Sequence, residues 1–372
     1  MKRRVVILSV VAMVSGAWLG AAGPAAGAAG ADYHLYFGDL HNHTRFSDGW
    51  DGTPRDAFVH ARESGADWLW TSDHNFMLTQ DEWDTSKRMA EQETSSRFVA
   101  AAGSEYWIAN GFGEIIVNNV DELWNKANFR VGRPGLSRAE VIPVFYDWLA
   151  SHPGAIGHWP HPGLYGDQDE FGHWTPFRDR AMSSIEIHNY GSWLGAPAAW
   201  GEHDYEDAYL TALDNGWHVM PAAVSDTHDV DWISGSPVRT VLLAERLTRN
   251  DLYDAMRANR GYATLDENLR VRYMLNGRVM GSTLGSVGRM LTVDIHVEDP
   301  NGMSKDAITL IEVVSDGGRV VARRATNAAS VDWATTVESE SARYFYVRVT
   351  TASDVTGGEG VTAWTAPVWT GR

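Results

Sequence analysis

The sequence contains no cysteine among its 372 residues. This absence excludes a disulfide framework, a zinc site built from thiolates and a cysteine nucleophile. Basic residues are also scarce, because 31 lysines and arginines stand against 48 aspartates and glutamates, which gives a formal net charge of −17. Since an acidic surface repels polyanions, we expect no binding to extended DNA or RNA, and a small molecule as the substrate.

The N-terminal part of the chain combines basic residues with a short apolar run. This run, Val5–Val14, is short for a span of about 20 residues. Lys2, Arg3 and Arg4 precede this run, and small residues follow it up to Ala31. This order predicts a secretory signal peptide over residues 1–31, with an uncleaved anchor as the alternative. We therefore expect a secreted, extracellular protein that leaves the membrane after signal removal.

From residue 32 to residue 268, short apolar runs alternate with stretches of helical pattern. Strands are expected at 33–39, 67–71, 98–102, 114–118, 155–157, 184–188, 218–223 and 240–244. Helices are expected at 53–64, 80–96, 137–150, 204–215 and 249–260. Repeated strand–helix units predict an α/β fold with a parallel sheet, and this many of them favour a (β/α) barrel.

The pattern changes from residue 269 onward. Five β-like runs, at 291–297, 308–315, 320–325, 330–337 and 344–350, are separated by turns such as Asp316-Gly317-Gly318. Short strands at this spacing are typical of a sandwich. We therefore expect three parts: the signal peptide over 1–31, a barrel over 32–268 and a small all-β sandwich-like domain over 269–372.

Candidate metal ligands follow the predicted strands of the barrel. His41 and His43 stand two residues apart on an extended segment, so both imidazoles point to one side and can reach one metal ion. Other titratable residues follow this and later strands: Asp48, Asp73, His74, Glu105, His158, His161, Glu186, His188, Asp226 and His228. Because active sites of such barrels lie where the parallel strands end, this distribution predicts a metal centre there.

Five short motifs resemble those of the PHP (polymerase and histidinol phosphatase) superfamily of metallohydrolases, over about residues 34–265. The motifs are His41-x-His43 with Ser47-Asp48-Gly49, Ser72-Asp73-His74, Glu105 after Gly103, His161-Pro162 and Ser225-Asp226-x-His228. The resemblance implies a distorted (β/α)7 TIM-like barrel. It also implies two or three divalent metal ions, which would be zinc, manganese or iron.

The resemblance further implies three groups of ligands. One metal would be held by His41, His43 and Asp226. A second would be held by His161, with Glu105 as the bridge from the first. A third would be held by Asp48, His74 and His228.

One position departs from the family pattern. Members of the superfamily often carry a Gly-His pair on the strand after the bridging glutamate, whereas this chain has Gly113-Glu114. Glu114 can serve as an oxygen ligand, support a ligand from behind, or bind nothing. As a ligand it would favour a harder ion such as Mn²⁺ over Zn²⁺ at the second position.

Other residues in or near the motifs are candidates for supporting or catalytic roles. His188 is a candidate acid–base catalyst, and Glu186 would orient a ligand. His158 either hydrogen-bonds to the site or packs inside the barrel. Asp73 is expected to support a neighbouring histidine, and Arg45 either clamps an oxyanion or lies on the surface.

Tryptophan is frequent, with 17 residues in the chain. Five of them stand close to the motifs: Trp50, Trp107, Trp159, Trp193 and Trp232. They either pack loops against the barrel or form an aromatic rim around a substrate pocket, and we place Trp107 in that pocket.

The expected reaction is hydrolysis by water that the metals activate. No Ser/His/Asp triad, glycine-rich phosphate loop or dinucleotide fingerprint occurs in its required context. A phosphoesterase for small phosphomonoesters or phosphodiesters is the first expectation. A carbamate, ester or amide hydrolase is the alternative, because the C-terminal β region resembles the secreted branch that includes bacterial carbaryl hydrolases. A non-catalytic binding module with structural metals is the third.

Overall fold

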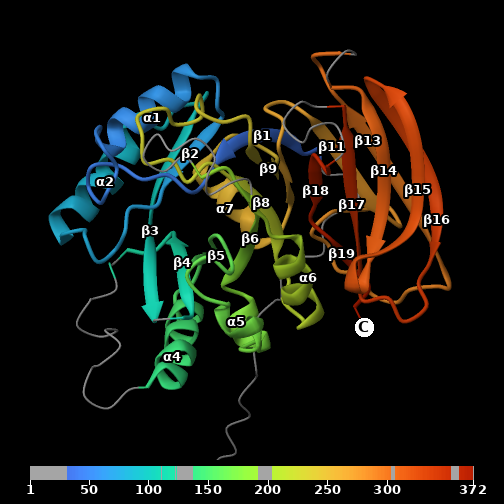
Figure 1. Ribbon diagram of the computed structural model, residues 1–372, viewed down its shortest axis with the longest axis horizontal. Coiled ribbons are helices and arrows are strands. Elements are labelled where there is room, and N and C mark those ends of the chain that lie inside the picture. Colours follow the sequence, from blue (N-terminus) through green and yellow to red (C-terminus); the bar gives the residue numbers. More distant parts are fainter. Residues whose placement is uncertain are drawn as a thin grey trace, which may run out of the picture.

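The structure is a computed structural model that describes residues 32–109, 111–121, 123, 137–191, 203–302, 306–352 and 360–371. The predicted signal peptide and Trp193 lie outside these residues. Figure 1 shows a part made of strands and helices beside a part made of strands. Within the described ranges, no helix is long and apolar enough to cross a membrane.

The first part alternates strands and helices, as the sequence predicts. Its strands are β1 (His34–Asp39), β2 (Trp68–Thr71), β3 (Val99–Ala109), β4 (Gly113–Asn118), β5 (Ile156–Trp159), β6 (Met182–Asn189), β7 (His203–Asp204), β8 (Met220–Val224), β9 (Arg239–Ala244) and β10 (Gly261–Thr264). Its helices are α1 (Pro54–Glu63), α2 (Gln80–Glu93), α4 (Arg138–Ser151), α5 (Pro176–Asp179), α6 (Glu206–Asp214) and α7 (Arg249–Arg257), with the short 3-10 helix η1 (Gln168–Phe171).

Local sequence signals explain where the first two helices begin. The side chains of Thr53 and Thr79 accept hydrogen bonds from the backbone of the first turn, and Asp56 and Glu82 return the contact in capping boxes. Each helix buries one face, which includes Phe58 in α1 and Trp83 in α2. Because these helices cover the sheet, β2 and β3 are almost entirely buried.

The strands of the first part form a mixed sheet. The pairs β1–β2, β2–β3, β5–β6 and β6–β8 are parallel, whereas β4 runs antiparallel to both β3 and β5. Only residues 110–112 separate β3 from β4, which is too short for the crossover that a parallel pair needs. The expectation of a parallel sheet is therefore wrong at β4, and also at β9, which runs antiparallel to β1.

The chain segments that follow β1 and β8 meet beyond the ends of these two strands. Asn42 forms an isolated parallel bridge with Thr227, and Asp226 donates its backbone N–H to the carbonyl of His41 at 3.1 Å. Along β1 itself, the neighbouring strands are the parallel strand β2 and the antiparallel strand β9. The mixed α/β fold is thus confirmed, whereas a closed (β/α)7 barrel is not.

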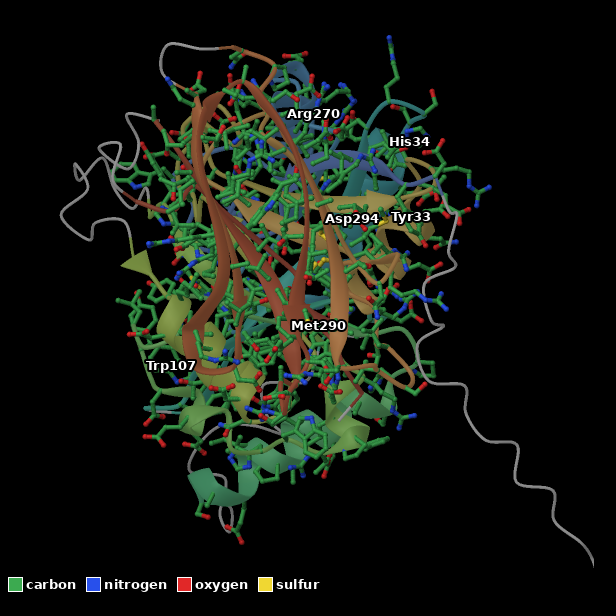
Figure 2. All side chains as sticks on the ribbon, turned by 90° about the vertical axis from the view of Figure 1, so that its right-hand side faces the viewer. Tyr33, His34, Trp107, Arg270, Met290 and Asp294 are labelled. Atoms are coloured by element: carbon green, nitrogen blue, oxygen red, sulfur yellow. The ribbon has the colours of Figure 1, made fainter. Side chains whose placement is uncertain are left out.

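The second part is all-β, in agreement with the sequence. One sheet contains β11 (Arg270–Leu275), β12 (Arg278–Val279), β13 (Met290–Glu298) and β16 (Ser330–Glu338). The other contains β14 (Ile308–Ser315), β15 (Arg319–Ala328), β17 (Tyr344–Thr351), β18 (Ala363–Thr365) and β19 (Val368–Trp369), with the 3-10 turn η2 (Asp316–Gly318) between β14 and β15. Buried residues of both sheets share one hydrophobic cluster. Figure 2 faces this part, with Arg270 of β11 and Met290 and Asp294 of β13 labelled.

The two parts are joined through a continuous sheet. β18 pairs antiparallel with β10 of the first part and with β17 of the second. Arg343, before β17, adds a link to α6, because its guanidinium donates to the carbonyl and the carboxylate of Asp214 at 2.6 and 2.8 Å. The domain boundary at residue 268 stays a prediction.

Candidate metal centre

The loop that follows β1 is held in place by a buried carboxylate. Asp73 accepts hydrogen bonds from the backbone N–H of Thr44 at 2.7 Å and from the hydroxyl of Ser47 at 2.8 Å. On the other side of the loop, the indole N–H of Trp232 donates to the carbonyl of His43 at 3.0 Å. Asp73 therefore holds the loop of the first motif in place through the backbone N–H of Thr44 and the hydroxyl of Ser47.

Four side chains converge on one point: His41 and His43 follow β1, Glu105 lies within β3 and Asp226 follows β8. Nε2 of His41 lies 3.1 Å from Nε2 of His43, 3.4 Å from Oε2 of Glu105 and 3.1 Å from Oδ1 of Asp226. Nε2 of His43 lies 3.3 Å from the same oxygens of Glu105 and Asp226. Both imidazole nitrogens are thus close to each other and to a carboxylate oxygen of each acid.

These distances fit a metal ion. Ligands at about 2.0 to 2.1 Å from a tetrahedral metal are about 3.3 Å apart, which is the length of the edges of the tetrahedron. The five donor–donor distances among His41, His43, Glu105 and Asp226 lie between 3.1 and 3.4 Å. Oδ1 of Asp226 is buried and makes no hydrogen bond. The donor set of two imidazoles and two carboxylates suits zinc, manganese or iron.

Glu105 also belongs to a second group of donors. Its Oε1 lies 3.1 Å from Nε2 of His161, and its Oε2 lies 3.3 Å from Nδ1 of His74. Glu114 faces the same space, with carboxylate oxygens 3.6 Å from His74 and 3.6 Å from His161. Oε2 of Glu114 and Nδ1 of His74 are buried and make no hydrogen bond. The residues that the family resemblance assigns to a second metal therefore meet, together with Glu114.

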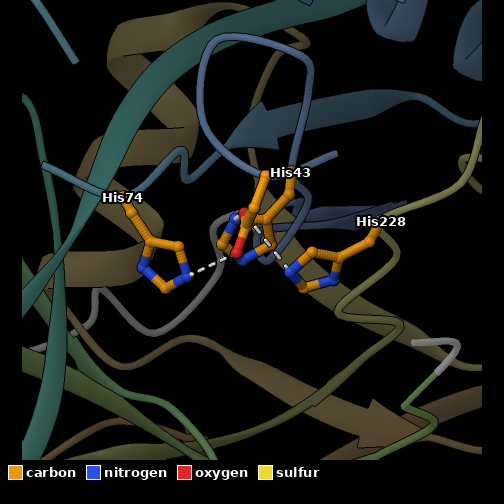
Figure 3. A group of neighbouring side chains, drawn as sticks. His43, His74 and His228 are labelled. Atoms are coloured by element: carbon orange, nitrogen blue, oxygen red, sulfur yellow. Dashed lines mark ion pairs between the residues drawn. The ribbon is translucent and has the colours of Figure 1, made fainter. Parts of the chain in front are cut away.

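A third group surrounds Asp48. Its carboxylate lies 3.4 Å from Nδ1 of His43, 3.3 Å from Nε2 of His74 and 3.5 Å from Nε2 of His228. Figure 3 shows the three labelled imidazoles converging on this carboxylate. The rings of His43 and His228 stack, with centroids 4.1 Å apart. All eight predicted ligands thus lie in one connected centre.

The electrostatics of the centre favour cations. Burial raises the pKa values of Glu105 and Asp226, but His41 and other imidazoles hold both well below their usual range. Burial and the charge of Glu105 raise the pKa of Glu114 to about 7. Burial alone would lower the pKa of His161, yet the hydrogen bond to Glu105 raises it to about 9. Raised pKa values of this kind favour protonated groups in the metal-free protein, so metal binding would release protons.

Glu186 organises the layer behind the ligands. It lies 2.7 Å from Nδ1 of His41, 3.2 Å from Nε2 of His158 and 2.5 Å from the backbone nitrogen of His161, which donates to it. Because Nδ1–H of His41 is used here, Nε2 of that ring is left to bind metal. His158 is buried and also contacts the hydroxyl of Ser184 at 2.8 Å.

A β-bulge in β6 changes which residue faces the centre after Glu186. Glu186 is opposite Ala222 and His188 is opposite Ala223, so one extra residue interrupts the alternation of side chains. As a result Asn189 reaches the centre and donates to Glu186 at 3.0 Å and to Asp226 at 3.1 Å. Sequence reasoning missed Asn189, because a bulge cannot be read from strict alternation. His188 is buried in β6, and its catalytic role stays a prediction.

Two of the clustered residues have unusual backbone conformations. Asp226 has a φ of 50° and His161 a φ of 24°, both on the left-handed side that residues other than glycine rarely adopt. The surrounding hydrogen bonds hold these conformations in place, including the one from His161 to Glu186. Such strain is concentrated at functional sites.

An apolar rim borders the mouth of the centre. Phe76, Trp107, Leu164 and Tyr165 line the cavity together with the donors, and each is more than a third exposed. The rings of Trp107 and Tyr165 lie 5.9 Å apart. Among the described residues, no lysine or arginine lines this cavity. The mouth therefore suits a substrate with an apolar group, and neither lysine nor arginine among the described residues supplies positive charge to the cavity.

Two rim residues contact the ligands directly. Phe76 stacks on His74 at a centroid distance of 5.0 Å, and Tyr165 meets His161 edge to face at 5.3 Å. Both follow a motif histidine closely in sequence, at positions +2 and +4, which is a signal that could have indicated them.

The other residues named from the sequence lie in different places. Trp107 lines the cavity, as expected. Trp50 is exposed, whereas Trp159 and Trp232 are buried and pack the surrounding structure. Arg45 is exposed and does not line the cavity in the described part of the chain.

Comparison with known proteins gives distant structural neighbours. No protein-family model and no curated protein matches the chain. A two-domain protein from Bacteroides vulgatus that contains a predicted PHP-like metal-dependent phosphoesterase is similar at 15% identity and a TM-score of 0.48, over 90% of this chain and 96% of that one. A proposed metal-dependent phosphoesterase from Bifidobacterium adolescentis shares 17% identity at a TM-score of 0.33, over 51% and 87% of the two chains. An amidohydrolase from Chromobacterium violaceum shares 18% identity at a TM-score of 0.33, also over 51% and 87%.

Proposed function

We propose that this chain is a metal-dependent hydrolase of the PHP kind, and that it cleaves small phosphomonoesters or phosphodiesters. The observation that carries the proposal is the position of Glu105, whose Oε2 faces the imidazoles of His41 and His43 while its Oε1 faces the imidazole of His161. A carboxylate shared in this way is suited to hold two divalent ions side by side. Paired ions are a recurring arrangement in enzymes that cleave phosphate esters.

When bound, such ions lower the pKa of a coordinated water and neutralise charge on the ester oxygens. The chain's own residues do the rest. His41, His43 and Asp226 fix one ion position, and Glu186 holds the tautomer of His41. Asn189 donates to Asp226 and so restrains its carboxylate.

The rim gives this proposal a substrate preference. Phe76 and Trp107 are exposed at the mouth and offer flat apolar surfaces. Aromatic faces of this kind bind an aryl or similar planar group by stacking and by burial of apolar area. We therefore propose esters with an aromatic or apolar group as the preferred substrates.

Assays with two phosphate esters and one carbamate test the proposal. The metal-loaded protein should hydrolyse p-nitrophenyl phosphate or bis-p-nitrophenyl phosphate, and the activity should disappear after dialysis against a strong chelator. Loss of activity in an Asp226→Asn variant, which keeps the size of the side chain, would tie turnover to this centre. If neither phosphate ester is cleaved by protein whose metal content has been verified, the phosphoesterase assignment fails.

A second candidate is a carbamate, ester or amide hydrolase. The specific observation in its favour is that neither lysine nor arginine lines the cavity over the described residues. A neutral substrate needs no such cationic side chain, whereas an anionic phosphate would be bound more tightly by one. Hydrolysis of 1-naphthyl N-methylcarbamate without hydrolysis of the two phosphate esters would select this candidate. If the metal-loaded protein cleaves none of the three compounds, a binding module with structural metals becomes the better account.

Metal identity and location are also proposals. The donor set is compatible with zinc, manganese or iron, and the carboxylate of Glu114 favours Mn²⁺ at the second position. The composition of residues 1–31 supports export from the cell. Mass analysis of the protein recovered from culture medium would show whether the chain begins near residue 32.

A further inference from the structure

A second group of carboxylates lies away from the metal centre, at one end of the β-sandwich. Asp266 follows β10, Asp299 follows β13 and Asp306 precedes β14, and one oxygen of each lies within 4.8 Å of the others. Arg270, labelled in Figure 2, marks this end of the sheet, because it is paired with Glu298, the residue before Asp299. Sequence analysis did not indicate this group, since its members are 33 and 7 residues apart in the chain.

The carboxylate of Asp299 has an unused oxygen that is buried. The residue is 2% exposed, and its Oδ2 makes no hydrogen bond. Its other oxygen accepts the backbone N–H of Asn301 at 2.8 Å. Burial, with the nearby charges of Asp266 and Asp306, raises the pKa of Asp299 to about 6. A buried carboxylate oxygen without a donor is costly unless a cation compensates it.

The loop that carries Asp266 is ordered around its carboxylate. Oδ1 of Asp266 accepts the backbone N–H groups of Asn268 and Leu269 at 2.8 and 2.9 Å. Asn268 has its own Oδ1 buried without a hydrogen-bond partner. Oδ1 of Asn268 is therefore a second buried oxygen without a hydrogen-bond donor close to the three carboxylates.

We propose that Asp266, Asp299 and Asp306 bind a structural Ca²⁺ ion. The three donors are carboxylates without a histidine, which selects a hard cation over zinc. Calcium binds oxygen at about 2.3 to 2.6 Å, so donors on opposite sides of the ion stand about 5 Å apart, a sphere that accommodates the three oxygens. The donors come from irregular connections, which suits the flexible geometry of calcium better than the strict octahedron of magnesium.

Such an ion would join the two parts of a chain that has no disulfide. Asp266 belongs to the connection from β10 to β11, whereas Asp299 and Asp306 flank the connection from β13 to β14. One ion would therefore connect the segment between β10 and β11, through which the chain enters the sandwich, to the connection between β13 and β14. Its role would be stability, independent of the proposed hydrolysis.

Thermal unfolding of the full chain with calcium alone tests the proposal. After chelation and buffer exchange, 1 mM Ca²⁺ should raise the melting temperature by about 5 °C, the shift expected for a site occupied well above its Kd. The shift should be lost in Asp299→Asn and kept in Asp294→Asn, an exposed aspartate on β13 that serves as the matched control. It should also be kept in His41→Ala, which separates this site from the catalytic one.

Three results would overturn the proposal. They are the absence of a calcium-induced shift in the wild-type protein, an undiminished shift in Asp299→Asn, and an equal shift with 1 mM Mg²⁺. If Asp299→Asn does not fold, Asp306→Asn takes its place, because Asp306 is only half-buried. Direct titration with Ca²⁺ should then show one ion fewer per chain in that variant than in Asp294→Asn, and equal stoichiometry would contradict the site.

Discussion

Oε1 of Glu186 lies 2.7 Å from Nδ1 of His41, and both side chains are fully buried. A histidine that donates one ring N–H to a carboxylate presents its other nitrogen to a metal in a fixed direction. The contact therefore connects β6, which carries Glu186, to the ligand that follows β1. It makes Glu186 a positioning residue for the first metal.

Replacing Glu186 with glutamine should weaken metal binding without removing a ligand. The variant keeps the size of the side chain but loses the charge that supports the imidazole, and losses of this kind cost about 10- to 100-fold in metal affinity. Competition with a chromogenic chelator measures the change. Glu267→Gln, at an exposed position of the β10–β11 loop, serves as the control. Unchanged affinity in Glu186→Gln would show that the contact does not position His41.

Metal binding at the second position should depend on pH through Glu114. Since its pKa in the metal-free protein is about 7, a proton on Glu114 competes with the metal below that pH, and this part of the proton competition fades above it. The affinity for the more weakly bound ion should therefore rise between pH 6 and pH 8, and the rise should be smaller in Glu114→Gln. Titration of the chelated protein at several pH values measures this. An equally steep pH dependence in the variant would remove Glu114 from the ligand set.

The apolar rim should affect substrate binding more than the chemical step. Trp107→Ala should raise KM for an aryl phosphate by roughly 10-fold, because a lost stacking contact and its buried area cost about 1 to 2 kcal/mol. An alkyl phosphate should be affected less. Trp50→Ala provides the control, since Trp50 is exposed and does not line the cavity. A fall in kcat with unchanged KM would contradict a role in binding.

The link between the two parts of the chain should contribute modestly to stability. Arg343 contacts Asp214 and Asp316 at 2.8 Å each, and all three side chains are partly exposed. Arg343→Ala should therefore lower the free energy of unfolding by about 1 kcal/mol. Partial burial raises the pKa of Asp316, but the contact with Arg343 outweighs burial and holds this pKa below its usual value. The contribution of Asp316 is thus complete above about pH 4 and is lost as the pH falls further. Denaturant unfolding of both proteins at pH 7 and pH 3 should show the difference shrinking, and a constant difference would contradict the ion pair.

The sequence was informative where a residue type and its spacing report the chemistry directly. The pair His41 and His43 and the Asp226-x-His228 pair follow strands, Glu105 follows the predicted range of β3, and the structure brings these positions together. The mixed α/β first part and the all-β second part also follow from local patterns. Strand β3 exceeds its predicted range and reaches Ala109 because pairing with β4 extends it, a tertiary effect that a local pattern does not contain.

Features that depend on long-range pairing were not accessible in this way. The bulge that turns Asn189 toward the centre arises from the register between β6 and β8. The antiparallel direction of β4 and the pairing of β10 with β18 join segments whose contact no local periodicity reports. The carboxylates of Asp266 and Asp299 meet only because two separate connections share one end of the sandwich.

The most direct test of the account is the metal content of the purified protein. Elemental analysis should find at least two divalent ions per chain in the wild type, and at least one ion fewer in the double variant His41→Ala/Asp226→Ala. Hydrolysis should fall to background after chelation and return when Mn²⁺ or Zn²⁺ is added. A double variant with the metal content of the wild type, or full activity in chelated protein with no residual metal, would contradict the account.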